Sequence, residues 1–242
     1  MTSPDPASEH LHRPAQDTPP TDDGRHRATV RTFTPRWRMS PLTQERMDRL
    51  MPEHGVGLDP AERVARLGRT APLVLEIGSG HGAAAIAYAQ AHPEHDVIAV
   101  EVHVPGVARM LARVEEEGVA NLAVHRGDAL TYLQDAVAAG ELEAVHLFFP
   151  DPWPKARHAK RRLVQQDTLD LIASRLRPGG HLLVATDHAA YADHVRAQLA
   201  EHGGYEVVEG QRPAWRPSDG FEDKGVAAGR RIQELRLTPF AP

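Results

Sequence analysis

The 242-residue chain contains no cysteine. This absence excludes disulfide bonds, thiolate nucleophiles and zinc sites with cysteine ligands, and it suits a protein of the reducing cytoplasm. The chain also has no apolar run near the roughly 20 residues that a membrane-spanning helix needs. Its first residues lack the basic and then apolar pattern of a secretory signal peptide. We therefore expect a cytoplasmic protein without a membrane partner.

Aromatic residues are few, and positive charge is not in excess. Phe, Trp and Tyr make up 5% of the chain, and its formal net charge is −5 at pH 7. A uniformly basic surface is thereby excluded, so a contact with nucleic acid would need a local patch. The 15 histidines show no HExxH-type spacing, and we expect no metal site. Solvated or helix-end side chains are the expectation for His10, His12, His26, His54, His92, His95, His125 and His202.

Composition divides the chain into three parts. Residues 1–28 are rich in Pro, Asp, Ser and Thr with little to bury, which predicts a disordered N-terminal extension. Residues 29–70 form a basic-aromatic segment with short helical pieces that we expect to pack on the core. Residues 71–242 have the length of one α/β domain. The second part carries a candidate basic patch with interleaved aromatic rings, made of Arg31, Phe33, Arg36, Trp37 and Arg38.

Short apolar runs alternate with segments of helical length from residue 71 onward. The runs read LVLEIG, DVIAVE, NLAVHRG, AVHLFFP and HLLVATD. This alternation predicts a parallel sheet with helices on both of its faces. Two further strands are expected in YEVVEG and RIQELRL, with RPAWRPSDGFEDKG as the loop between them.

A glycine-rich turn, EIGSGHGAAAIAYA, follows the first predicted strand. Gly78, Gly80 and Gly82 permit a tight turn and let a ligand approach the backbone at a helix N-terminus. Together with Ala83 the glycines also fit a dinucleotide fingerprint, so by themselves they leave open a nicotinamide cofactor or an adenosine-containing one such as S-adenosylmethionine.

Three acidic residues end successive strands and favour the second cofactor. Glu101 ends the second strand, where it can accept both ribose hydroxyls, and Asp128 follows the third, where it can meet an adenine amine. Glu76 would repel a pyrophosphate but attract the ammonium and sulfonium groups of S-adenosylmethionine. The alternative for Glu76 is a solvated strand-end carboxylate.

The fourth strand runs into PDPWPKARHAKRR, a loop stiffened by three prolines. Ligands of open α/β sheets bind beyond the strand ends, which places Asp151 beside the cofactor, with a helix cap as the alternative. Trp153 is either apolar filler or a surface on which a base stacks. A basic run follows, either as a solvated helix face or as a phosphate-binding strip for RNA: Lys155, Arg157, Lys160, Arg161 and Arg162.

From about Arg31 to its C-terminus the sequence resembles the bacterial tRNA (guanine-N7-)-methyltransferases. The segments that carry the resemblance are EIGSGHG, VEVHVPGV, LFFPDPWPKARHAKRRL, ATDHAAYADH and GFEDKG, in that order. The resemblance implies an α/β fold of the Rossmann-like class I methyltransferase type. Its mostly parallel seven-stranded sheet would carry helices on both faces and an antiparallel last strand.

The resemblance also implies the reaction and residue roles. S-adenosylmethionine would be the methyl donor, and the variable-loop guanine of tRNA the substrate, without a metal. Glu76, Glu101 and Asp128 would contact the cofactor, Asp151 would lie at the reaction centre, and Lys155 and Asp187 would contact the substrate. The family's substrate-side loop usually reads Thr-Lys-Phe-Glu, and the aligned residues are Asp219, Gly220, Phe221 and Glu222.

Several alternatives stay open at this point. A methyltransferase acting on another RNA, a protein or a small molecule would share the cofactor site. A non-catalytic RNA-binding module would share the fold, and the oligomeric state is either monomer or homodimer.

Overall fold

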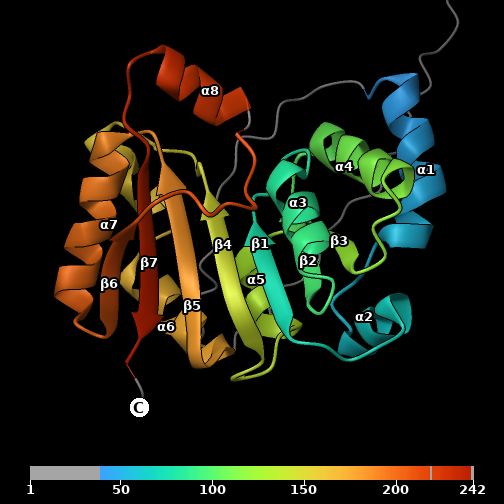
Figure 1. Cartoon of the computed structure of the whole chain (residues 1–242), viewed down its shortest axis with the longest axis horizontal. Coiled ribbons are helices and arrows are strands. Elements are labelled where there is room, and N and C mark those ends of the chain that lie inside the picture. The colour runs from blue at the N-terminus through green and yellow to red at the C-terminus, as the bar shows by residue number, and fades with distance from the viewer. Residues whose placement is uncertain (1–38, 219, 241–242) are drawn as a thin grey trace, which may run out of the picture.

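The computed structural model of the chain describes residues 39–218 and 220–240. Its strands form one seven-stranded sheet in the order β3-β2-β1-β4-β5-β7-β6 (Figure 1). The strands are β1 Leu73–Ile77, β2 Asp96–Glu101, β3 Leu122–Arg126, β4 Leu142–Phe148, β5 Leu176–Thr186, β6 Tyr205–Gly210 and β7 Gln233–Pro239. β7 runs antiparallel to both β5 and β6, while β1 to β5 pair in parallel. The expected sheet with an antiparallel last strand is confirmed.

Helices cover both faces of the sheet because its central strands are apolar on both sides. All five residues of β1 and all six of β2 are buried. α1, α3 and α4 pack on one face, and α5, α6 and α7 contribute to the core on the other (Figure 1). The helices are α1 Pro41–His54, α2 Pro60–Leu67, α3 Ala83–Ala91, α4 Val104–Glu116, α5 Ala129–Asp135, α6 Gln166–Arg175, α7 Ala189–His202 and α8 Gly220–Ala227. Among these, none is both long and apolar enough to cross a bilayer.

The segment before the sheet packs on the domain through its two helices. α1 begins after Ser40, whose hydroxyl accepts a hydrogen bond from the backbone amide of Thr43. Leu50 of α1 is fully buried in the core that includes α4. α2 is held through Arg63, which is 7% exposed and pairs with Glu141. The expected disordered extension and the patch from Arg31 to Arg38 lie outside the described residues.

Two expectations are wrong in detail. His125 is not solvated: it is 8% exposed on β3, and its Nδ1 lies 3.0 Å from the carbonyl oxygen of Val56. The first four residues of β3 are all buried, so a polar side chain among them is buried as well. The loop expected between β6 and β7 contains α8, a short helix without an apolar stripe that sequence periodicity could reveal.

Candidate functional site

The loops after β1, β2, β3 and β4 leave the same edge of the sheet, because these strands are parallel neighbours. β1 lies at the point where the strand order reverses, between β2 on one side and β4 on the other. Ligands of open α/β sheets bind at such a reversal, beyond the carboxyl ends of the strands. The glycine turn, Glu101, Asp128 and the Asp151 loop are therefore brought to one end of the molecule.

The glycine turn depends on backbone conformations that other residues rarely adopt. Gly78, Gly80 and Gly82 have φ angles of 70°, 56° and 81°. A Cβ on Gly82 would also lie 2.5 Å from the side chain of Met110. The turn thus brings α3 close against α4.

Glu101 holds this turn in place. Its Oε2 accepts a hydrogen bond of 2.8 Å from the backbone amide of Gly80, and its Oε1 accepts bonds from the amides of Val102 and His103. The residue is only 9% exposed. A carboxylate oxygen has two lone pairs, so these contacts leave acceptor capacity for a ribose. The link to Gly80 was not anticipated from the sequence, because it depends on β2 lying beside β1.

Asp128 caps α5. Its Oδ1 accepts hydrogen bonds of 2.9 and 3.0 Å from the backbone amides of Leu130 and Thr131. Both bonds use the same oxygen, so the second carboxylate oxygen, Oδ2, can still accept a bond from a ligand.

Glu76 lies inside the sheet and is not a solvated carboxylate. It is 3% exposed, and its Oε2 lies 3.9 Å from Nδ1 of His146 on β4. Burial lowers the pKa of His146 to about 3, which makes the ring neutral. Neither ring nitrogen of His146 has a hydrogen-bond partner among the described residues.

His146 was missed by the sequence analysis, although a histidine within the apolar run AVHLFF is the signal that could have found it. It belongs to an aromatic cluster that joins distant parts of the chain. Its ring centroid lies 4.8 Å from that of Tyr88 on α3, and 5.2 Å from those of Phe148 and Trp215. Through His146 this cluster lies beside Glu76.

The loop after β4 is strained on both sides of Asp151. Phe149 and Trp153 have φ angles of 48° and 39°, which non-glycine residues rarely adopt. Such conformations persist only where the surrounding structure enforces them, and they concentrate at functional sites. Asp151 itself is exposed at the tip of the loop.

Two arginines of the basic run hold the loop. Arg162 donates hydrogen bonds to the carbonyl oxygens of Pro152 and Trp153, at 3.1 and 3.2 Å. The guanidinium of Arg161 lies 4.8 Å from the centre of the Trp153 ring. Arg162 therefore has a positioning role that the sequence did not reveal, and Trp153 is half-buried rather than inserted in the core.

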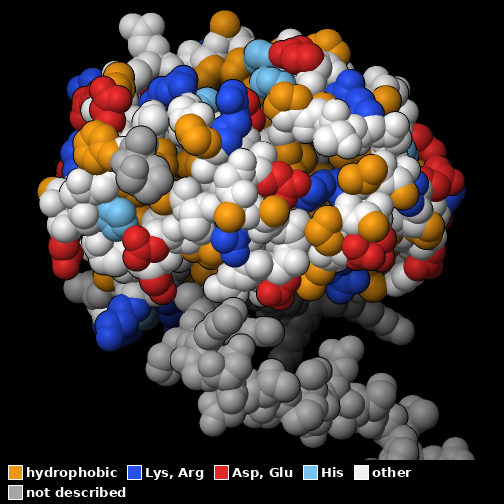
Figure 2. Space-filling view, turned by 90° about the horizontal axis from the view of Figure 1, so that it is seen from below, with side chains coloured by type: hydrophobic (Ala, Val, Ile, Leu, Met, Phe, Trp, Pro, Cys, Tyr) orange, Lys and Arg blue, Asp and Glu red, His pale blue; other side chains and the backbone are white. Residues whose placement is uncertain are grey.

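The remaining cations of the run are exposed on the 3-10 helix Ala156–Arg161 or just before it. Lys155, Arg157 and Lys160 form no ion pair with any residue that the structure describes. The opposite end of the molecule differs, because basic and acidic side chains alternate there without a single-sign patch (Figure 2).

The remaining residues predicted to contact the substrate lie around α8, and the structure places them in different environments. Asp187 follows β5, accepts a hydrogen bond of 2.9 Å from Nε of Arg230 and forms an ion pair with that side chain, close to Gly225 of α8. Gly220 begins α8 and is exposed. Asp219 and the side chain of Phe221 lie outside the described part of the chain.

Glu222 belongs to a buried ionic network that the sequence analysis did not foresee. Arg216, 3% exposed, pairs with Glu222 at 3.0 Å and also with Glu234 on β7. Its guanidinium lies 4.9 Å from the ring centre of Phe148 and 5.4 Å from that of Phe149. The network thus joins α8, β7 and the residues just before Asp151, so Glu222 is an internal support rather than an exposed contact.

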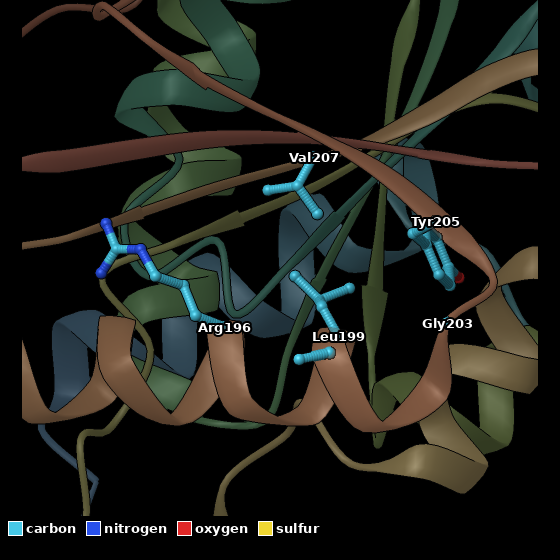
Figure 3. A pocket seen from close by; sticks show the side chains of 6 residues that line it. Arg196, Leu199, Gly203, Tyr205 and Val207 are labelled. Atoms are coloured by element: carbon cyan, nitrogen blue, oxygen red, sulfur yellow. The ribbon is translucent and has the colours of Figure 1, made fainter.

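A separate hollow between α7 and β6 contains none of the predicted site residues (Figure 3). It is lined by Arg196, Leu199, Ala200, Gly203, Tyr205 and Val207. β6 is the outermost strand of the sheet, several strands away from the reversal at β1 and β4.

Comparison with known proteins agrees with this arrangement. A family model described as "Putative methyltransferase" matches residues 70–235. A tRNA (guanine-N(7)-)-methyltransferase of Nitrosomonas europaea is 42% identical over 197 residues, covering 79% of this chain and 88% of the relative. Its counterpart from Nocardia farcinica is 42% identical over 246 residues, covering 92% and 91%. The solved 16S rRNA methyltransferase KamB has a TM-score of 0.54 at 16% identity, covering 77% of this chain and 96% of its own, a likeness in fold alone.

Proposed function

The chain belongs to the tRNA (guanine-N7-)-methyltransferase family, and we propose that it transfers a methyl group from S-adenosylmethionine to N7 of the variable-loop guanine in tRNA. The observation that carries this proposal is the strained loop with Asp151 at its tip, at the strand reversal that also bears the glycine turn. The loop supplies an exposed carboxylate and an adjoining strip of exposed cations.

The residues around the glycine turn fit S-adenosylmethionine better than a dinucleotide. When bound, this cofactor supplies a methyl group on a positively charged sulfur. Glu76 is a buried carboxylate near the turn, and it favours a cation and disfavours a pyrophosphate. Glu101 and Asp128 retain acceptor capacity for the ribose and the adenine amine. Gly78, Gly80 and Gly82 have no side chains, so the ligand can approach the backbone of the turn. This arrangement argues against the nicotinamide cofactor that the glycine pattern left open.

Guanine N7 already carries an in-plane lone pair, so the chain has to align the base rather than remove a proton. Trp153 carries the Arg161 guanidinium over its ring, 4.8 Å from the centre, and offers its other face for the base to stack on. Positive charge develops on the guanine during transfer, and Asp151 stabilises it as a fixed carboxylate. Phosphates of the bound tRNA are neutralised by Lys155, Arg157 and Lys160. The substrate is bordered on the side of β5 by Asp187 and α8.

The direct test is nucleoside analysis of tRNA after incubation with the protein and isotopically labelled S-adenosylmethionine. We expect labelled N7-methylguanosine in tRNA. Label in protein, in another RNA or on another atom of tRNA would favour one of the other methyltransferase functions. Cofactor binding without any transfer would favour a non-catalytic RNA-binding module.

Replacing Glu101 by alanine is expected to weaken binding of S-adenosylmethionine by at least tenfold. Charge-assisted hydrogen bonds contribute roughly 1.5 to 3 kcal/mol each, and about 1.4 kcal/mol is a factor of ten in affinity. Because Glu101 also anchors the amide of Gly80, the mutation loosens the turn as well. Calorimetric titration checks this result against Glu116→Ala, an exposed glutamate of α4. Equal affinities in the two variants would remove Glu101 from the cofactor site.

Neutralising Arg157 and Lys160 together is expected to weaken tRNA binding and to reduce its salt dependence. Each phosphate contact that is lost lowers the slope of log affinity against log salt by about 0.7 to 0.9. Arg161 is left intact because it contacts Trp153. The measurement is tRNA affinity at several salt concentrations for Arg157→Gln/Lys160→Gln, with Arg46→Gln/Arg109→Gln on α1 and α4 as the control of equal charge. An unchanged slope would show that the basic run is only a solvated face.

A further inference from the structure

The turn between α3 and β2 gathers two imidazoles and a carboxylate away from the glycine turn and the Asp151 loop. His92, Glu94 and His95 each offer one ligand atom, and these atoms all lie within 4.8 Å of one another. Nδ1 of His92 lies 3.1 Å from Oε1 of Glu94, and Nε2 of His95 lies 3.9 Å from the same oxygen. The turn lies before the first residue of β2, whereas the methyl-transfer site lies beyond the last.

These distances are close to those of a zinc site. Zinc binds histidine nitrogen and carboxylate oxygen at about 2.0 to 2.2 Å in tetrahedral geometry, which separates neighbouring ligand atoms by about 3.3 to 3.5 Å. The distance from Glu94 to His92 is slightly shorter than that value, and the distance from Glu94 to His95 is slightly longer. The Glu94 side chain is 61% exposed, so its torsions can change without disturbing the core.

A hydrogen bond from a neighbouring tyrosine orients one of the ligands. The hydroxyl of Tyr88 lies 2.7 Å from Nδ1 of His95, which leaves Nε2 as the nitrogen that faces Glu94. Metal-binding histidines usually engage their other ring nitrogen in this way, which sets the tautomer and the ring orientation. The rings of His92 and His95 are nearly parallel, at 15° and 5.5 Å between centroids.

The backbone of the turn is held by side chains from other elements. Asn121 donates from Nδ2 to the carbonyl oxygens of Ala89, His92 and His95, at 2.9 to 3.2 Å. Arg69 donates to the carbonyl oxygens of Pro93 and His95, at 2.7 and 2.9 Å. A turn fixed by such contacts loses little conformational freedom when an ion binds, and this favours affinity.

We propose that His92, Glu94 and His95 bind one divalent transition-metal ion of the zinc class, with water in the remaining position. Two neutral imidazoles and one carboxylate form a donor set that zinc accepts, and three protein ligands leave an open coordination position. The ion would fasten the end of α3 to the start of β2. Sequence spacing predicted no such site, because the three ligands come from a turn and not from one face of a helix.

The test is zinc titration of the full-length chain without an affinity tag, followed by calorimetry and by thermal unfolding. We expect one strong site and a higher melting temperature with zinc. Glu94→Gln and His95→Ala should each abolish the strong site. Tyr88→Phe, which keeps the ring and removes the hydroxyl, should weaken binding about 10- to 100-fold.

A matched control is His202→Ala. His202 lies 3.1 Å from Asp170, so it is another histidine-carboxylate pair but without a third ligand, and its loss should leave the strong site unchanged. Tetrahedral Co²⁺ gives a visible absorption band that should appear with the wild type and disappear with Glu94→Gln. The proposal is overturned if the wild type has no strong zinc site, or if Glu94→Gln and His95→Ala bind zinc as the wild type does. Because Glu94 is exposed, its variant separates loss of a ligand from loss of the fold.

Discussion

Replacing Asp151 by asparagine is expected to lower the rate of methyl transfer by roughly a hundred- to a thousandfold. Removing one group that stabilises developing charge costs about 2.7 to 4 kcal/mol of transition-state energy. The loop geometry supports this role, because the strained residues Phe149 and Trp153 hold a carboxylate at an exposed tip. The affinities for tRNA and for S-adenosylmethionine should change far less than the rate.

Single-turnover rates of the wild type and Asp151→Asn, between about pH 6 and 9, check both the size and the nature of the effect. N7 needs no deprotonation, so Asp151 should add no pH dependence of its own. The rates of the wild type and of Asp151→Asn should therefore vary with pH in the same way. Asp135→Asn, at the exposed end of α5, is the matched control and should behave as the wild type. Turnover near the wild-type value in Asp151→Asn, or loss of a steep pH dependence, would assign Asp151 another role.

Replacing Arg216 by alanine is expected to destabilise the fold by about 3 to 5 kcal/mol. Removing one partner of a buried ionic network leaves uncompensated charge behind, here on Glu234, whose ion pair is with Arg216. Arg212 provides the matched control: it pairs with the same Glu222 at 3.3 Å, but its side chain is 44% exposed. Arg212→Ala should therefore cost no more than about 1 kcal/mol. Urea unfolding of the two variants measures the difference, and similar losses in both would contradict the prediction.

The loss of folding stability caused by Arg216→Ala should depend on pH. Burial raises the pKa of Glu234, whereas Arg216 lowers it, so the pKa rises further when Arg216 is removed. A carboxyl group whose pKa is higher in the folded state than in the unfolded state destabilises the fold when it is ionised. The loss of stability should thus be largest at high pH and should shrink as pH falls through the raised pKa of Glu234. Unfolding midpoints of the variant and wild type at about pH 5.5 and 8 measure this trend.

Patterns within short stretches of sequence were sufficient for the main architecture. Each expected strand appears, because a strand buried on both faces must be a short apolar run and a covering helix must separate it from the next. The glycines of the turn and the prolines around Asp151 act on their own backbone, so their conformational effect can be read locally. The antiparallel direction of the last strand followed from the family resemblance and not from any local pattern, and the order β5-β7-β6 was not predicted.

The sequence by itself thus determined the strands, the glycine turn and the stiff loop with Asp151, because these depend on residues near one another in the chain. Tertiary structure alone decided what surrounds them. The bond from Glu101 to Gly80, the burial of His146 against Trp215, and the contacts of Arg216 with Phe149 all join distant segments. Such contacts depend on which strands become neighbours and which side chains then face each other. Neither apolar periodicity nor spacing along the chain records that information.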